Sequence, residues 1–384
     1  MRNWLLFLLS TLLAACAGPQ ALTQRPDHLF DDSLFAAPSE RISASEVFAL
    51  SDPMKQYLNT EIEAQLRRKG KVRGLIDALY EKGELKLDYD ASMTRNAVQA
   101  FEARSGNCLS LVIMTAAFAK EIGLKVRFQS AYLEEAYSRS SNLLLRSGHV
   151  NLSLGRSFFD SRSSPYENLL TIDFLPAEEL RGLRTREISE ETVVAMFMNN
   201  RAVEALVDGR IDDSYGWARE AVSADPRFLG AQNTLGVVYL RGNHLKHAAA
   251  VFGHVLDQEA ENKPALSNLA RTFARQGRID ESMALYRRLA QLEPDPPFHF
   301  FNLGLAAMKR QDFDAARDLF AKEVARADYY HEFHFWLGLA NFRLGDIERA
   351  RKHLTLALES STSRKDRELY AAKLDWLRAH GLKH

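Results

Sequence analysis

Small residues recur every 34 positions through the carboxy-terminal half of this 384-residue chain. One series with this spacing is Ala202, Gly236, Ala270, Gly304 and Gly338. A second series is Ser214, Ala248, Ser282, Ala316 and Ala350, and a third is Leu235, Leu269, Leu303 and Leu337. A fixed period of about 20–50 residues is typical of repeat architectures, in which each unit buries its apolar face against the next. The spacing therefore predicts a solenoid of stacked helices rather than one compact domain.

The repeated positions resemble the tetratricopeptide repeat, a 34-residue unit of two antiparallel helices with small residues where the helices meet. We place five gapless repeats at 195–228, 229–262, 263–296, 297–330 and 331–364. An amphipathic helix near 366–380 would cover the apolar end of the last repeat. An all-α solenoid is therefore predicted over 195–380.

The resemblance implies an inner groove that binds a protein or peptide. Equivalent positions of successive repeats carry cations or amides, namely Arg241, Arg275, Lys309 and Arg343, and Asn200, Asn268 and Asn302. One interpretation is a site for an acidic segment or a terminal carboxylate, held by charge-assisted hydrogen bonds. The other is that these residue types are frequent at such positions in the repeat family and bind no particular anion.

The amino terminus has the layout of a secretory signal, with one arginine followed by an apolar run and small residues. The run from Leu5 to Ala15 is too short to span a bilayer, which needs about 20 residues. Residues 13–16, Leu-Ala-Ala-Cys, resemble the bacterial lipobox, which implies a signal peptide over 1–15 and a lipid on Cys16. Cleavage as an ordinary signal peptide near Ala15 or Ala17 is the alternative.

Ala17, rather than aspartate, follows the cysteine, and in lipoproteins of this kind that implies the periplasmic face of the outer membrane. Residues 16–40 are rich in Ala, Pro, Gln, Asp and Ser. This composition predicts a flexible tether between the lipid and the first folded domain.

The middle of the chain, 41–190, combines helical and strand patterns. After Gly106, a long apolar and alanine-rich run places Cys108 in the first turn of a buried helix. Unpaired amide N–H groups and the helix dipole favour the thiolate, the nucleophilic form of cysteine, at that position. Alternating patterns then predict strands at 125–133, 148–154 and 169–174.

A cysteine on a helix, followed by a histidine and an aspartate on successive strands, resembles the transglutaminase-like (papain-related) fold. The resemblance covers about 80–180, and the approach to the cysteine matches at Tyr89, Thr94, Ala97, Phe101, Arg104 and Gly106. It implies Cys108 as nucleophile, His149 as the base and Asp173 as the group that orients the histidine. It also implies an oxyanion hole that uses the Cys108 N–H, with a second donor left unassigned. The family often has tryptophan where Asn151 stands.

Composition excludes several other classes. Basic and acidic residues number 50 each, which excludes a general nucleic-acid binder because such proteins need excess positive charge. Two cysteines are too few for a disulfide framework or a cysteine-built zinc site.

The histidine pairs at 331 and 334 and at 244 and 247 lack further ligands, so we interpret them as surface residues of the repeats and predict no metal. No phosphate loop or dinucleotide fingerprint occurs, so no cofactor is predicted.

The sequence supports two hypotheses of different kinds. In the first, an envelope lipoprotein carries a cysteine hydrolase or acyltransferase that acts on amide bonds of a protein or peptide presented by the repeats. In the second, a degenerate, non-catalytic transglutaminase-like domain supports a repeat scaffold for assembly of an envelope complex. Protease, amidase and transglutaminase share the triad and differ in what reaches the thioester, so the sequence leaves these open, together with the partner and the oligomeric state.

Overall fold

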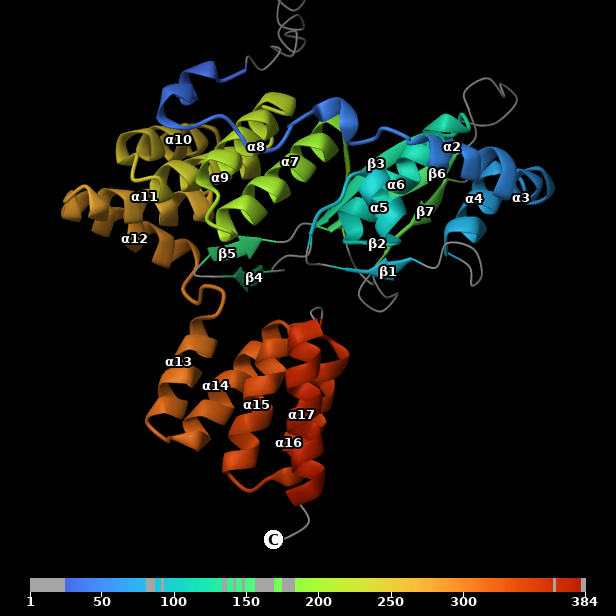
Figure 1. Ribbon diagram of the computed structural model, residues 1–384. Helices are drawn as coiled ribbons and strands as arrows, with labels where there is room; N and C mark the ends of the chain where they lie inside the picture. Colours follow the sequence, from blue (N-terminus) through green and yellow to red (C-terminus); the bar gives the residue numbers. More distant parts are fainter. Residues whose placement is uncertain are drawn as a thin grey trace, which may run out of the picture.

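The computed structural model describes residues 25–80, 87–90, 93–132, 137–140, 143–146, 149–155, 169–174, 184–361 and 364–380. The predicted signal peptide, Cys16 and the tether up to residue 24 lie outside the described residues. In Figure 1 an upper body holds the α/β region and the first helix pairs, and α13 to α17 form a lower body. Among the described residues, no helix has the length and apolar character needed to cross a membrane.

An α/β region follows the short 3-10 turns η1 (Asp27–Leu29), η2 (Asp32–Leu34) and η3 (Ala44–Glu46). Its helices are α2 (Asp52–Gln56), the π-helical turn η4 (Tyr57–Glu61), α3 (Glu63–Lys69), α4 (Lys71–Tyr80), α5 (Ala97–Ala103) and α6 (Cys108–Glu121). Its strands are β1 (Asp88–Tyr89), β2 (Ser105–Gly106), β3 (Lys125–Tyr132), β4 (Tyr137–Ser140), β5 (Leu143–Arg146), β6 (His149–Gly155), β7 (Leu170–Ile172) and β8 (Arg184–Ile188). The three predicted strands are present as β3, β6 and β7, and the polar strand β8 was not predicted.

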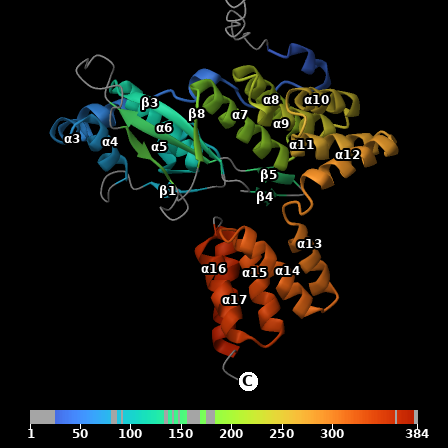
Figure 2. The same cartoon turned by 180° about the vertical axis from the view of Figure 1, so that it is seen from behind.

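The main sheet is antiparallel with the order β7-β6-β3-β8. Phe128 of β3 lies opposite Leu152 of β6, which in turn lies opposite Ile172 of β7. Helix α6 packs against β6 and β3 (Figures 1 and 2). Residues 109–119 of this helix are all buried, as expected for a helix that is apolar on every side. The helix is therefore a fixed support for the residue at its first position.

The carboxy-terminal region consists of antiparallel helix pairs followed by one further helix. The pairs are α7 (Glu190–Val207) with α8 (Ile211–Ala224), α9 (Leu229–Arg241) with α10 (Leu245–Gln258), α11 (Lys263–Arg275) with α12 (Ile279–Leu292), α13 (His299–Lys309) with α14 (Phe313–Arg326), and α15 (His331–Arg343) with α16 (Ile347–Glu359). Helix α17 (Arg364–His380) packs on α16, as predicted for the capping helix. The first pair begins at residue 190, five positions before the predicted start of the repeats.

The recurring glycines allow the two helices of a repeat to approach closely. A Cβ on Gly236 would lie 2.5 Å from the ring of Phe252, and a Cβ on Gly304 would lie 2.5 Å from the ring of Phe320. Both rings are fully buried. In these two repeats the glycine therefore marks the position where one helix receives an aromatic ring from the other, and Gly338 faces Leu354 in the same way.

The repeats follow one another in the sequence without insertions, as predicted, but their stacking is interrupted after the third repeat. Helices α12 and α13 do not pack on each other as other consecutive helices of the array do, and the apolar core divides between them. Tyr286 is 43% exposed, whereas the equivalent Phe252 and Phe320 are buried. In the third repeat the position equivalent to these glycines is Ala270, which is fully buried. Leu303 of α13 is correspondingly 45% exposed.

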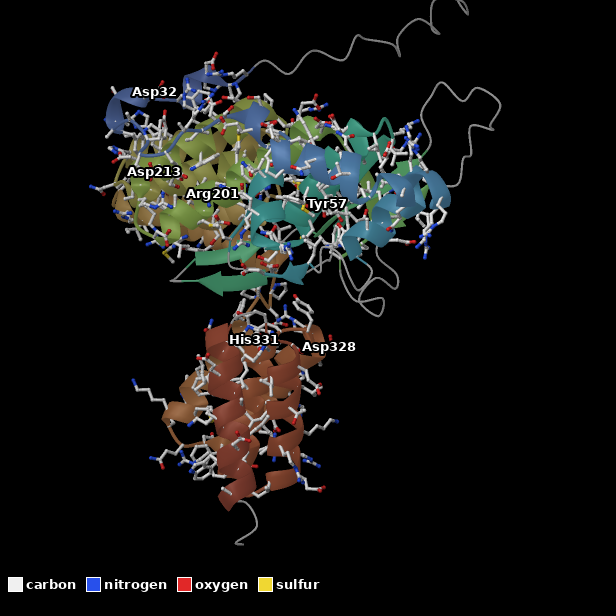
Figure 3. All side chains as sticks on the ribbon, turned by 45° about the vertical axis from the view of Figure 1, so that its right-hand side comes forward. Asp32, Tyr57, Arg201, Asp213, Asp328 and His331 are labelled. Carbon is white, nitrogen blue, oxygen red and sulfur yellow. The ribbon has the colours of Figure 1, made fainter. Side chains whose placement is uncertain are left out.

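Residues 25–40, here called the strap, lie along the first two repeats instead of forming a flexible tether (Figure 3). The ring of Phe35 stacks on Tyr215 of α8 at 4.0 Å. The N–H of Asp31 donates to the Tyr239 hydroxyl at 2.9 Å. Glu40 accepts from the Trp217 indole at 2.9 Å. Composition alone suggested a tether because these partners lie 177 to 208 positions away along the chain.

Acid is expected to destabilise the fifth repeat through two stacked histidines. His334 Nε2 donates to the Asp328 carbonyl at 2.8 Å, so its Nδ1 accepts from His353 Nδ1 at 3.1 Å. Burial, and next the repulsion that a protonated His334 would exert, lowers the pKa of His353 to about 4. The folded state therefore binds fewer protons than the unfolded state, and stability falls as the pH drops from about 6.5 towards 4.

We expect the melting temperature to fall by about 2–4 °C between pH 7.5 and 5, measured by thermal unfolding of the full chain. The variant His353→Gln should lose most of this dependence, because an amide keeps a donor and does not titrate. The matched control is His299→Gln, at a surface histidine of α13. An unchanged pH dependence in His353→Gln would contradict the prediction.

Candidate active site

Cys108 is the first residue of α6 and is a free, partly exposed thiol. Asn107 caps the helix, and its side-chain oxygen accepts from the Ser110 N–H at 2.9 Å. Gly106 precedes the cap because a Cβ there would lie 2.6 Å from Ser110 Cβ. The backbone before α6 therefore passes close to Ser110 in the first turn of the helix. Cys108 lies at the positive end of the helix dipole.

His149 and Asp173 come together through the pairing of two strands. His149 begins β6 and is 4% exposed, and Asp173 directly follows β7. Because Leu152 pairs with Ile172, the end of β7 lies beside the start of β6. His149 Nε2 lies 2.6 Å from Asp173 Oδ1. The carboxylate thus holds one ring nitrogen, and Nδ1 is the nitrogen left for Cys108.

The protonation of His149 reflects both of its neighbours. Burial lowers the pKa of His149, but the hydrogen bond to Asp173 and the hydrogen bond and charge of Cys108 raise it, to about 9 overall. The structure therefore brings Cys108, His149 and Asp173 together. The arrangement favours an imidazolium beside the thiol at neutral pH, and such a cation stabilises a thiolate.

Asn151 was missed as a site residue by the sequence interpretation, which noted it only as a departure from tryptophan. Its side-chain N–H donates to Asp173 Oδ2 at 2.7 Å, so both carboxylate oxygens are held. Asn151 lies two positions after His149 on β6, and residues with this spacing share one face of a strand. The two-residue spacing from His149 was the sequence signal by which Asn151 could have been identified.

An aromatic wall adjoins the aspartate. The ring of Phe174 lies 5.3 Å from the ring of Tyr80, the last residue of α4. The Tyr80 hydroxyl bonds the Thr115 hydroxyl of α6, and burial raises the pKa of Tyr80. Tyr80 therefore stays neutral at physiological pH.

The predicted cationic groove does not form one surface. Arg275 donates to the Leu240 carbonyl at 2.7 Å and to Asn243 Oδ1 at 2.8 Å, so it binds the carboxy-terminal end of α9. The guanidinium of Arg343 lies over the Phe313 ring, 4.2 Å from its centroid. These cations stabilise contacts within and between repeats, where helix carbonyls lack partners within the helix.

The asparagines predicted to line the groove also make contacts elsewhere in the chain. Asn200 donates to the Thr94 hydroxyl of the α/β region at 3.2 Å. Asn268 accepts from Arg271 at 2.7 Å. Arg241, Asn302 and Lys309 are exposed, and the gap between α12 and α13 separates Arg241 from the other two. The second and fourth repeats therefore do not present these residues in one groove.

The predicted surface histidines have contacts within the chain. His331 Nδ1 lies 2.7 Å from the Tyr370 hydroxyl, and His247 Nε2 lies 3.2 Å from Asp31 Oδ2. Within the part of the chain that the structure describes, no three metal-binding side chains gather at one point.

Comparison with known proteins identifies the class of the carboxy-terminal region. Two family models, both described as tetratricopeptide repeat, match residues 243–299 and 301–364. Tetratricopeptide repeats are therefore present in this region, and such repeats generally bind protein partners.

One relative is Tetratricopeptide repeat protein 8 of Caenorhabditis elegans, which is 30% identical over 110 residues. The match covers 28% of this chain and 22% of that protein. Among solved structures, a thermophilic tetratricopeptide-repeat protein of Thermus thermophilus has 17% identity and a TM-score of 0.30, and covers 47% of this chain and 98% of its own. Yeast Tom70 has 12% identity and a TM-score of 0.34, and covers 48% and 40%.

Proposed function

We propose that the α/β region is a transglutaminase-like cysteine hydrolase or acyltransferase that acts on amide bonds, and that the repeats bind its protein substrate or a partner. The observation that carries the proposal is the 2.6 Å contact of His149 with Asp173, in a histidine that also contacts Cys108. The three side chains come from the start of a helix and the ends of two strands. They occur in the order Cys, His, Asp along the chain.

The geometry supports a two-step acyl transfer. The Cys108 thiolate attacks the amide carbonyl carbon, and the N–H groups at the start of α6 stabilise the developing oxyanion. The His149 imidazolium gives its proton to the leaving amine, the C–N bond breaks and a thioester remains. Water or a second amine then attacks the thioester, gives its proton to His149 and releases the Cys108 thiolate. Which of the two nucleophiles reaches the thioester decides between hydrolysis and transfer.

The second candidate function is a repeat scaffold for assembly of an envelope complex, with a non-catalytic α/β region. The repeat-family matches favour it, because such repeats generally bind proteins. In this case Cys108 is an ordinary thiol.

The proposal extends to location, as an envelope lipoprotein on the periplasmic face of the outer membrane. It rests on the resemblance of residues 13–16 to a lipobox, which lies outside the described residues. The strap begins nine residues after Cys16, a distance of at most about 30 Å for an extended chain. A lipid on Cys16 would therefore hold the first two repeats close to the membrane surface.

Alkylation of Cys108 by iodoacetamide between pH 5 and 10 separates the two functions. We expect rapid reaction already at pH 6, and an ordinary profile with a midpoint near pH 8.5 after His149→Ala, because the thiolate then has no imidazolium partner. The rate is followed by mass spectrometry of the peptide that contains Cys108. An ordinary profile in the unaltered protein would reject the enzyme and leave the scaffold.

A further inference from the structure

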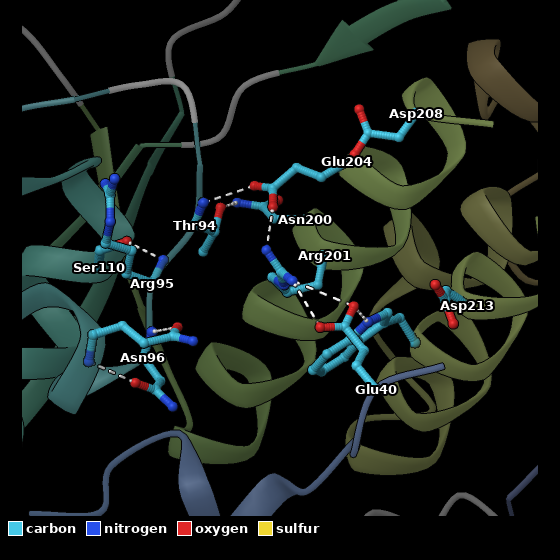
Figure 4. Close-up of polar contacts among 12 residues, drawn as sticks. Glu40, Thr94, Arg95, Asn96, Ser110, Asn200, Arg201, Glu204, Asp208 and Asp213 are labelled. Atoms are coloured by element: carbon cyan, nitrogen blue, oxygen red, sulfur yellow. Dashed lines mark hydrogen bonds and ion pairs between the residues drawn. The ribbon is translucent and has the colours of Figure 1, made fainter. Parts of the chain in front are cut away.

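A partly buried path of hydrogen bonds connects the first repeat to the helix that carries Cys108. Its centre is Thr94, which is 1% exposed (Figure 4). The Thr94 N–H donates to Glu204 Oε1 of α7 at 2.7 Å. The Thr94 hydroxyl accepts from Asn200 of α7 at 3.2 Å and from Asn107 at 2.9 Å. Two residues of the repeat and the cap of α6 therefore meet on one residue.

The contact with Asn107 fixes the cap of α6. The Asn107 side-chain oxygen accepts from the N–H and the hydroxyl of Ser110, both at 2.9 Å. Its side-chain nitrogen is held by Thr94, so both ends of the amide are occupied. An amide held at both ends cannot rotate without breaking hydrogen bonds inside the protein. The next residue along the chain is Cys108, so the cap fixes the backbone from which the thiol projects.

The same path continues through the repeat to the strap. Arg201 of α7 pairs with Glu204 at 3.0 Å and with Glu40 of the strap at 3.1 Å. Its guanidinium also lies over the Trp217 ring, 5.5 Å from the centroid. A movement of α7 or of the strap would therefore change the contacts of Thr94.

We propose that Thr94 is a positioning residue for Cys108, and that Asn200 and Glu204 make the reactivity of Cys108 depend on the placement of the first repeat. The inference rests on the proposed enzymatic function and names its regulation. A partner or membrane contact that displaces α7 releases Thr94, loosens the Asn107 cap and lowers the fraction of thiolate. The repeats thus regulate the nucleophile, in addition to binding proteins.

The test is the pH profile of Cys108 alkylation by iodoacetamide in the full-length protein. Thr94→Val keeps the shape of the side chain and removes the hydroxyl that accepts from both amides. We expect about a tenfold lower rate below pH 7, which corresponds to about one pH unit in the midpoint of the profile. The rate above pH 9.5 should stay unchanged, because every accessible cysteine is then a thiolate. A merely structural loss of access would lower the rate at every pH.

Further variants at Thr94 and Glu204, with one control, make the test more specific. Thr94→Ser should restore the profile, since serine keeps the hydroxyl. Glu204→Ala should shift the profile in the same direction as Thr94→Val, and Glu204→Gln should shift it less, because glutamine still accepts from the Thr94 N–H. The matched control is Thr192→Val, which removes another α7 hydroxyl, one that donates to Asp225 at 2.6 Å. It should leave the profile unchanged.

The outcomes are distinguishable. Rapid alkylation of the unaltered protein at pH 6, with the same profile in Thr94→Val and Glu204→Ala, would overturn this inference and leave the proposed function standing. An ordinary profile in the unaltered protein would overturn both. If Thr94→Val does not fold, as judged by circular dichroism, Asn200→Ala gives the same decision, because it removes one partner of Thr94 from the partly exposed surface of α7.

Discussion

Replacing Cys108 by alanine is expected to abolish formation of a covalent acyl intermediate and to lower turnover of an activated ester by about a thousandfold or more. The reason is that the thiolate is the group that forms the thioester, and no other cysteine lies in the described part of the chain. The measurement is release of p-nitrophenol from p-nitrophenyl acetate, with mass spectrometry for the acetyl group. Residual turnover equal to that of the unaltered protein would contradict the proposed chemistry.

The partners of the cysteine provide controls for this result. His149→Ala should lower turnover nearly as far, because residues that act as one unit are not additive. The matched control is His299→Ala, which removes a surface histidine 3.9 Å from the carboxylate of Asp295. That variant should retain full turnover.

The rate of acylation by an amide substrate is expected to fall at alkaline pH. The leaving amine needs a proton from His149, whose pKa of about 9 sets the alkaline limit. Asp173→Asn keeps a hydrogen bond but removes the charge, so the pKa of His149 and the alkaline limit should both fall. The contribution of His149 to the free energy of unfolding also falls at alkaline pH. It is fully present below about pH 6.5 and is lost as the pH rises through about 9. An alkaline limit unaffected by Asp173→Asn would mean that another group sets it.

The second large effect concerns stability. Phe252→Ala is expected to cost about 3–5 kcal/mol of unfolding free energy, because it empties a fully buried ring position against Gly236. The equivalent change one repeat later, Tyr286→Ala, should cost less than about 1 kcal/mol, because this ring is 43% exposed. Urea unfolding of both variants, followed by circular dichroism, measures the difference. Equal losses would mean that α13 covers α12 in solution.

The repeats were largely predictable because their signal is periodic. A residue such as Gly304 recurs at a fixed interval, and the reason is a contact between two helices adjacent in the chain. The interruption after the third repeat was not predictable from the period. It depends on how the helices of the third and fourth repeats pack, and there the Tyr286 ring remains 43% exposed.

The candidate site was predictable in its three main residues and not in their support. The order of Cys108, His149 and Asp173 on a helix and two strands is a feature of the chain, and strand pairing brings the last two within 2.6 Å. The contact of Thr94 with Asn200 joins residues 106 positions apart, and no local pattern indicates it.

The sequence by itself therefore determined the 34-residue repeat, three of the four strands of the main sheet and the three side chains that meet at the candidate site. These features depend on spacing along the chain, which the physics of helices and strands converts directly into structure. Only the tertiary structure decided that the strap lies on the first repeats, that Arg275 binds a helix end, and that Thr94, which bonds the cap of α6, also contacts α7. Such contacts depend on how completed elements pack, and each is determined by burial and by the pairing of polar groups in three dimensions.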